Sequence, residues 1–280
     1  MNDTALQAAG TTSAARRHAV KVLGQPGGRP VVLLHGFGAS QDAWHRILPA
    51  FAAEHRVVLL DLAGSGAAEP AAYDHERHSD LDGYARDVLD VCAELDLHDV
   101  VLVAHSISAM IAARVAVAAP ERITHLVMLA PSARYVDEPA TDYQGGFSRE
   151  DIEELLDSLD HNYFAWAAAV APMVMGNPER PELGEELTTA FRQTDPGTAR
   201  GFARTTFLSD SRDLLAQVHT PTLILQCRFD ALAPEVAVEH VHAGIAGSVL
   251  VPLQAAGHCP HVSAPDETSE VVLDHLRRRG

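Results

Sequence analysis

The sequence predicts an α/β protein with a mostly parallel β-sheet, helices on both faces and an inserted group of four helices. Short, wholly apolar runs alternate with helical stretches as far as residue 131, as is typical of parallel strands covered on both faces. The alternation stops between residues 132 and 213 and resumes after Pro221. We therefore expect a core formed by residues 18–131 and 214–280, with residues 132–213 as a helical lid.

Composition limits the class of protein. The chain has 280 residues and a formal charge of −17, which disfavours binding to nucleic acid or to an anionic membrane. Its three cysteines, an odd number without a CxxC pair, predict no disulfide framework. Residues 1–17 are expected to form a disordered tail, since they lack the apolar segment of a signal peptide. With no apolar run of about 18 residues, we expect a cytoplasmic protein outside the membrane.

The strands expected in the first half are short runs rich in branched apolar residues. They span residues 18–23, 31–34, 57–60, 100–103 and 123–129. Besides the Ala-rich helix that ends before Pro120, two helices are expected between them. One starts near Ser40 and runs through Trp44 to Phe51 on a single apolar stripe, and the other spans residues 81–95.

Four helical patterns fill the expected lid. A capping-box sequence at residues 148–151 precedes the first, and Asp160 is expected to cap the second. The third and fourth begin at Pro181 and Pro196, because proline is favoured in the first helical turn. The core then resumes with strands at 222–226 and 248–253 and helices at 234–242 and from Pro265 onward.

The stretch around Ser106 carries the first functional signal. Residues 100–119 read as strand, sharp turn and helix, with Ser106 at the turn. This resembles the nucleophile elbow of α/β-hydrolases, in which Gly-x-Ser-x-Gly holds a serine in a strained backbone conformation. Ala104 and Ser108 stand at the two glycine positions, and both are small. By itself the stretch also fits an ordinary strand-to-helix turn.

Two further polar residues follow later strands. Asp230 comes after strand 222–226, and His258 comes after strand 248–253. The carboxyl ends of parallel strands gather at one edge of a sheet, and the chain order Ser, Asp, His is that of this fold. Serine needs a base, histidine can accept and return a proton, and a carboxylate fixes the histidine tautomer. The sequence therefore predicts a catalytic triad of Ser106, His258 and Asp230.

An oxyanion hole is expected beside the serine. The backbone N–H of Ile107, directly after Ser106, provides one donor, and the N–H of Phe37 in His-Gly-Phe-Gly at 35–38 provides the other. His105 is not expected to be the base, because its side chain should point away from Ser106.

No metal or cofactor is expected. His258, Cys259 and His261 lie close together, but no second ligand pair is visible elsewhere in the sequence. Cys259 is interpreted as a packed thiol. Haloperoxidase-like activity of the same triad is an alternative that no residue distinguishes.

Longer motifs make the resemblance more specific. The chain is similar to the RsbQ-type α/β-hydrolases of bacterial stress signalling and to their plant relatives, the strigolactone and karrikin receptors. The motifs that carry the likeness are HGFG (35–38), HSISAMI (105–111), PSARY (131–135), YQGGF (143–147), NYFAW (162–166), NPERPE (177–182), TDPGTARGFARTTFLSDSR (194–212), PTLILQCRFDALAP (221–234) and GHCPHVSAPDET (257–268). Ala104 departs from the glycine that is usual in this family.

The resemblance implies a four-helix lid over a small apolar pocket. The pocket walls that it implies are Phe37, Tyr135, Phe147, Trp166, Val170 and Phe207. It also implies hydrolysis of a small hydrophobic ester or lactone in a signalling role, since the relatives couple slow hydrolysis to a protein contact. The alternative function is a ligand-sensing regulator that binds a PAS-domain serine phosphatase through the lid during a general stress response.

Overall fold

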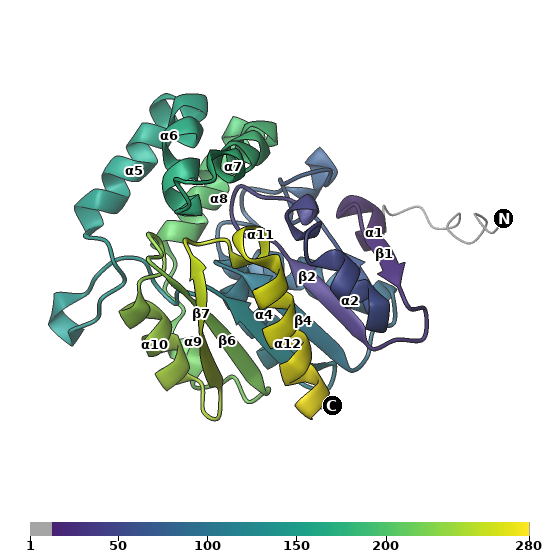
Figure 1. Ribbon diagram of the computed structural model, residues 1–280. Helices are drawn as coiled ribbons and strands as arrows, with labels where there is room; N and C mark the ends of the chain where they lie inside the picture. Colours follow the sequence, from purple (N-terminus) through teal and green to yellow (C-terminus); the bar gives the residue numbers. More distant parts are fainter. Residues whose placement is uncertain (1–12, 280) are drawn as a thin grey trace.

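A seven-stranded sheet forms the centre of the computed structural model, which describes residues 13–279 (Figure 1). The strand order is β1-β3-β2-β4-β5-β6-β7, and only the pairing of β1 with β3 is antiparallel. The strands are β1 (Lys21–Gly24), β2 (Pro30–Leu34), β3 (Arg56–Leu59), β4 (Val100–His105), β5 (Ile123–Leu129), β6 (Thr222–Arg228) and β7 (Val249–Ala256). The predicted mostly parallel sheet is confirmed.

Helices cover both faces of this sheet, as alternation of side chains along each strand requires. Val32 and Leu34 of β2 belong to one buried cluster, with the helices α3, α4 and α10, whereas Val31 and Leu33 belong to the other, with α2 and α12. These helices are α2 (Leu48–Glu54), α3 (Leu81–Glu94), α4 (Ser108–Ala118), α10 (Glu235–Gly244) and α12 (Pro265–Arg279). Consecutive residues of a strand thus contribute alternately to the two cores, one on each face of the sheet.

The inserted helices follow β5 and precede β6, and they stand beyond one end of the sheet (Figure 1). They are α5 (Arg149–His161), α6 (Tyr163–Met175), α7 (Pro181–Gln193) and α8 (Pro196–Leu208). Ser148 and Asp151 form the expected capping box at α5, and Asp195 caps α8 through the Thr198 N–H. The residue that caps α6 is Asn162, so the expectation for Asp160 was wrong.

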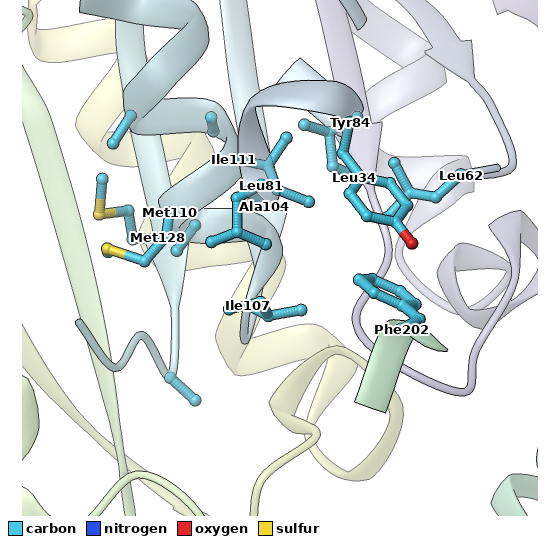
Figure 2. Packing of buried hydrophobic residues seen from close by; sticks show 14 of the residues in the cluster. Leu34, Leu62, Leu81, Tyr84, Ala104, Ile107, Met110, Ile111, Met128 and Phe202 are labelled. Atoms are coloured by element: carbon cyan, nitrogen blue, oxygen red, sulfur yellow. The ribbon is translucent and has the colours of Figure 1, made fainter. Parts of the chain in front are cut away.

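Aromatic contacts join this lid to the core. Tyr84 of α3 and Phe202 of α8 stack with ring centroids 4.5 Å apart, and Figure 2 shows the two rings facing each other beside Leu34 and Leu62. Figure 2 also shows Ile107 and Met110 at the start of α4 in the same cluster. The lid is therefore continuous with the larger core rather than resting on its surface.

Two other expectations need correction. Part of the predicted tail is ordered: Ala14–Arg17 form the short helix α1, which Ser13 caps, while residues 1–12 lie outside the described residues. The single helix expected from Ser40 is two pieces, the 3-10 helix η1 (Gln41–Trp44) and then α2, which starts one residue before Pro49. Proline lacks an N–H and clashes with the preceding turn, so it begins a new helix here.

Short elements complete the chain. They are the 3-10 helices η2 (Pro70–Ala72) and η3 (Pro139–Thr141) and the helices α9 (Arg212–Leu215) and α11 (Pro260–Ser263). Within residues 13–279, no helix is both long and apolar enough to cross a membrane.

Candidate active site

Ser106 stands at the sharp turn between β4 and α4. Its backbone φ is +57°, the left-handed region that costs a non-glycine residue energy and that is typical of a nucleophile elbow. Ala104 is completely buried, and the Ser108 hydroxyl donates a hydrogen bond to the carbonyl of His35. Ser108 is therefore more than a small residue, because it ties the start of α4 to the loop after β2.

Three distant side chains meet at this turn. His258 Nε2 lies 2.7 Å from the Ser106 hydroxyl, and its Nδ1 lies 2.8 Å from Asp230 Oδ2 and 3.0 Å from Oδ1. The side chains of His258 and Asp230 are 2% and 1% exposed. Asp230 Oδ1 also accepts hydrogen bonds from the N–H groups of Leu232 and Ala233, which fix the carboxylate. A proton on Nδ1 satisfies Asp230 and leaves Nε2 free to accept from Ser106.

Phe37 and Ile107 are the two residues whose backbone N–H groups were expected to form the oxyanion hole. Phe37 follows β2, which is the neighbour of β4, and Ile107 is the N-cap residue of α4. Among the described residues, neither N–H has a hydrogen-bond acceptor. An unused donor near a serine hydroxyl can serve an oxygen that gains negative charge.

Aromatic residues of the lid hold the loop that carries Phe37. The Phe37 ring packs against four lid rings at centroid distances of 5.6–6.1 Å, namely those of Trp166, Phe191, Phe202 and Phe207. Gly38 has a φ of +71°, and a Cβ there would lie 1.6 Å from the Phe191 ring. His35 orients the same loop, since its Nδ1 bonds the Gly36 carbonyl and its Nε2 accepts from Leu62 N–H. Burial lowers the pKa of His35, which fits this neutral, one-donor state.

A cavity of about 390 Å³ opens onto Ser106 and His258. Five of the six expected wall residues line it, namely Phe37, Tyr135, Trp166, Val170 and Phe207. The acidic lining residues Asp42 and Glu186 and the imidazole of His45 have side chains that are 82%, 37% and 52% exposed, so they belong to its solvent side. The interior presents mainly apolar and aromatic groups around a few hydroxyl and imidazole groups.

Phe147, the sixth expected wall residue, is not among the lining residues. The segment after β5 folds back on itself, so that Phe147 pairs with Val136 and its N–H bonds the Tyr135 carbonyl. Its side chain packs against the core instead. Other lid residues that were not expected do line the cavity, including Leu155, Val174, Leu187 and Phe191. Their helical spacing was visible in the sequence, but it could not separate a pocket face from a packing face.

The polar side chains next to Ser106 and His258 take no part in the contacts between Ser106, His258 and Asp230. His105 is turned toward the His258 backbone, where its Nε2 lies 2.8 Å from the carbonyl oxygen. Burial raises the pKa of the Cys259 thiol far above its usual range, as expected of a packed cysteine. No group of three or more His, Cys, Asp or Glu side chains within residues 13–279 is arranged to hold a metal ion.

Known proteins resemble this chain over almost its whole length. The model of the alpha/beta hydrolase family matches residues 31–271. The chain is 35% identical over 261 residues to a probable esterase of Oryza sativa subsp. japonica, covering 93% of this chain and 96% of that protein. It is 36% identical over 260 residues to the karrikin insensitive 2 receptor CA of Petunia hybrida, with coverage of 92% and 95%.

Solved structures of other proteins share the fold of this chain. A hydrolase from Oleispira antarctica superposes with a TM-score of 0.91 at 36% identity, covering 94% of this chain and 96% of that one. A bromoperoxidase from Bacillus anthracis has a TM-score of 0.84 at 21% identity and covers 92% and 94%, which shows a shared fold alone. The plant relatives are those that the sequence motifs indicated. This chain therefore belongs to the alpha/beta hydrolase family.

Proposed function

We propose that this protein is a serine hydrolase that acts on a small hydrophobic ester or lactone in the lid-covered cavity. The observation that carries the proposal is the unbroken chain of short contacts from Ser106 through His258 to Asp230. A strained serine, a buried imidazole and a fixed carboxylate are the three parts that acyl transfer to serine requires.

The reaction follows from the contacts. His258 Nε2 accepts the Ser106 proton as Oγ attacks the carbonyl carbon of the substrate. The oxyanion that forms is stabilised by the N–H groups of Phe37 and Ile107. Asp230 keeps the Nδ1 proton of His258 in place and stabilises the imidazolium. His258 then gives its proton to the leaving oxygen, and water repeats the sequence to release the acid.

The cavity supports the substrate class. A volume of about 390 Å³ lies at the small end of ligand pockets, and its interior is mainly aromatic and aliphatic. Relatives named as esterases include a probable esterase from rice and a strigolactone esterase from Arabidopsis thaliana. A small, largely apolar ester or lactone is the ligand that such a space favours.

Loss of the serine tests the proposal. We expect a fluorophosphonate probe to label the wild-type protein and not Ser106→Ala. Turnover of p-nitrophenyl acetate should fall by roughly a million-fold in the variant, since triad members act as a unit. Equal labelling or equal turnover in the two proteins would show that Ser106 is not the nucleophile.

A signalling role is a second candidate, because several relatives are named as receptors rather than enzymes. We propose, for this role, that the ligand-bound lid contacts a PAS-domain serine phosphatase. The lid helix α6 exposes Phe164 and Met173, which are 50% and 51% accessible and lie outside the cavity.

The two roles separate in one experiment. Phe164→Ser with Met173→Ser should leave ester turnover unchanged and abolish binding to a purified phosphatase of this class. If wild-type protein does not bind that phosphatase with or without an ester ligand, the signalling role is rejected and the hydrolase proposal is unaffected.

A further inference from the structure

The Tyr135 hydroxyl has an unusual position beside the serine. It lies 3.4 Å from Ser106 Oγ, and Tyr135 lines the cavity although only 1% of its surface is exposed. Its ring packs edge-on against Phe207 at 5.2 Å. Its backbone carbonyl accepts the Phe147 N–H, and a Cβ added to Gly145 would lie 2.4 Å from the same carbonyl oxygen. The side chain is therefore held in place before any ligand enters.

The hydrogen on this hydroxyl can be assigned by elimination. His258 Nδ1 carries a proton for Asp230, so Nε2 accepts and the Ser106 hydroxyl donates to it. The single hydroxyl hydrogen of Ser106 is then engaged with His258 Nε2, so Tyr135 must be the donor in the contact between the two hydroxyls. That contact is longer than the usual 2.7–2.8 Å of an O–H···O bond. In the absence of a ligand, the Tyr135 hydroxyl therefore donates only a long, weak hydrogen bond to Ser106.

The sheet order places this donor opposite one wall of the oxyanion hole. Phe37 follows β2, on one side of β4, whereas Tyr135 follows β5, on the other side. His258 follows β7, which lies on the β5 side. A leaving group must depart toward His258, because His258 returns the proton to it. Tyr135 and the departing oxygen are therefore on the same side of Ser106.

We propose that the Tyr135 hydroxyl donates a hydrogen bond to the leaving-group oxygen of the bound ester and is a further catalytic residue. This inference rests on the proposed function. It also names a substrate class, namely esters and lactones whose leaving oxygen becomes basic as the bond breaks, such as alkyl and enol esters.

The step balances without a proton from tyrosine. The bond from Ser106 Oγ to the carbonyl carbon forms, and the bond from that carbon to the leaving oxygen breaks with its electron pair going to oxygen. The proton that left Ser106 reaches this oxygen through His258 Nε2. Tyr135 keeps its own proton throughout, and burial raises its pKa well above the usual range, so it remains a donor at any working pH.

A leaving-group series tests the proposal. The probes are acetate esters of nitrophenol, chlorophenol, phenol, trifluoroethanol and ethanol, and kcat/KM is plotted against the pKa of the leaving alcohol. For Tyr135→Phe we expect a loss of less than about threefold with p-nitrophenyl acetate and of about ten- to hundredfold with ethyl acetate, because a donor matters more as charge on the oxygen grows. The plot should become steeper than that of the wild type.

Tyr143→Phe is the matched control. Tyr143 belongs to the same folded-back segment, and its hydroxyl donates to the Arg134 carbonyl, but it does not line the cavity. Loosening the segment should lower all rates by a similar factor and leave the slope unchanged. Replacing Tyr135 with 3-fluorotyrosine, a more acidic donor, should flatten the slope, and this variant decides the question if Tyr135→Phe does not fold.

The outcomes are distinguishable from those of the main proposal. An unchanged slope in Tyr135→Phe, or an equal loss with every ester, overturns the role of Tyr135 while Ser106-dependent turnover stands. Absence of Ser106-dependent turnover in the wild type overturns the proposed hydrolase and the Tyr135 step together.

Discussion

His105, the residue before the serine, supports the site through the backbone rather than through the reaction. Its Nε2 donates to the carbonyl of His258 across 2.8 Å, which leaves Nδ1 unprotonated. That Nδ1 lies 2.7 Å from where a Cβ on Gly36 would be, so the ring also fills the space beneath the loop of Phe37. One imidazole thus joins the serine strand, the loop after β2 and the loop of His258. We interpret His105 as a positioning residue.

The variant His105→Phe keeps the ring and removes the donor. We expect kcat to fall about tenfold or more while KM changes less, because the His258 carbonyl loses its partner and the imidazole shifts. Stability should fall by about 1–3 kcal/mol, the cost of a buried acceptor without a donor. Steady-state kinetics and urea unfolding measure both. His55→Phe, at the opposite end of the sheet before β3, should change stability without changing kcat; an unchanged kcat in His105→Phe contradicts the interpretation.

At the scale of elements, the end of α6 is docked on the loop that carries His258. Gly176 ends α6 in a left-handed conformation, and a Cβ on it would lie 2.7 Å from the Cα of Gly257. The His258 N–H donates to the Val174 carbonyl, and Asn177 bonds the carbonyls of Met175 and Ala256. Direct contacts therefore join this lid helix to the backbone of His258, and we expect a shift of one to displace the other.

Gly257→Ala tests that coupling. Gly257 has a φ of +79°, and an added Cβ would lie 1.9 Å from the Met175 carbonyl oxygen. We expect a stability loss of about 3 kcal/mol or more, from the backbone conformation and the clash together, with a lower kcat. Unfolding and ester turnover are the measurements.

Gly247→Ala separates the two causes. Gly247 has a similar φ of +74° with nothing near its would-be Cβ, so this variant should cost only about 1 kcal/mol and leave kcat unchanged. Equal effects of the two alanines on stability and kcat would mean that the contact with α6 does not matter.

Four buried histidines make the stability of the whole molecule sensitive to pH. His18, His35, His105 and His261 are each at most 5% exposed. Desolvation lowers the pKa of all four, and it takes that of His261 to about 3. Histidines of the unfolded chain keep a pKa of about 6.5, so each of these four groups binds a proton less readily in the folded protein. His261, with its pKa of about 3, is neutral there near pH 5.

The free energy of unfolding should therefore change with pH even at pH values above those at which carboxylates titrate. The unfolded state binds more protons below pH 6.5, so the folded state has its full stability above that pH and loses it on acidification. His261 alone should contribute a loss of about 1.4 kcal/mol per pH unit between its two pKa values. Urea midpoints at pH 7.5, 6 and 5 measure the slope, and His261→Gln should reduce it. A flat profile from pH 7.5 to 5 contradicts the prediction.

Much of this architecture was predictable from local signals. Short contiguous stretches of sequence predict the apolar strands β2, β4 and β5 and the capping box before α5. The polar residues after three strands could be placed at one edge because parallel strands end together. The break before α2 is also local, and Pro49 was the overlooked signal.

Periodicity and turn chemistry act over a few residues, so local signals predicted most of the strands and helices and the polar residues at the edge of the sheet. The side chains that face the cavity could be recognised only in the folded molecule. Phe147 turns to the core, Phe191 reaches the Phe37 loop, and the Tyr135 hydroxyl comes within 3.4 Å of Ser106. These placements depend on how the lid docks on the sheet, and that packing joins residues far apart in the chain.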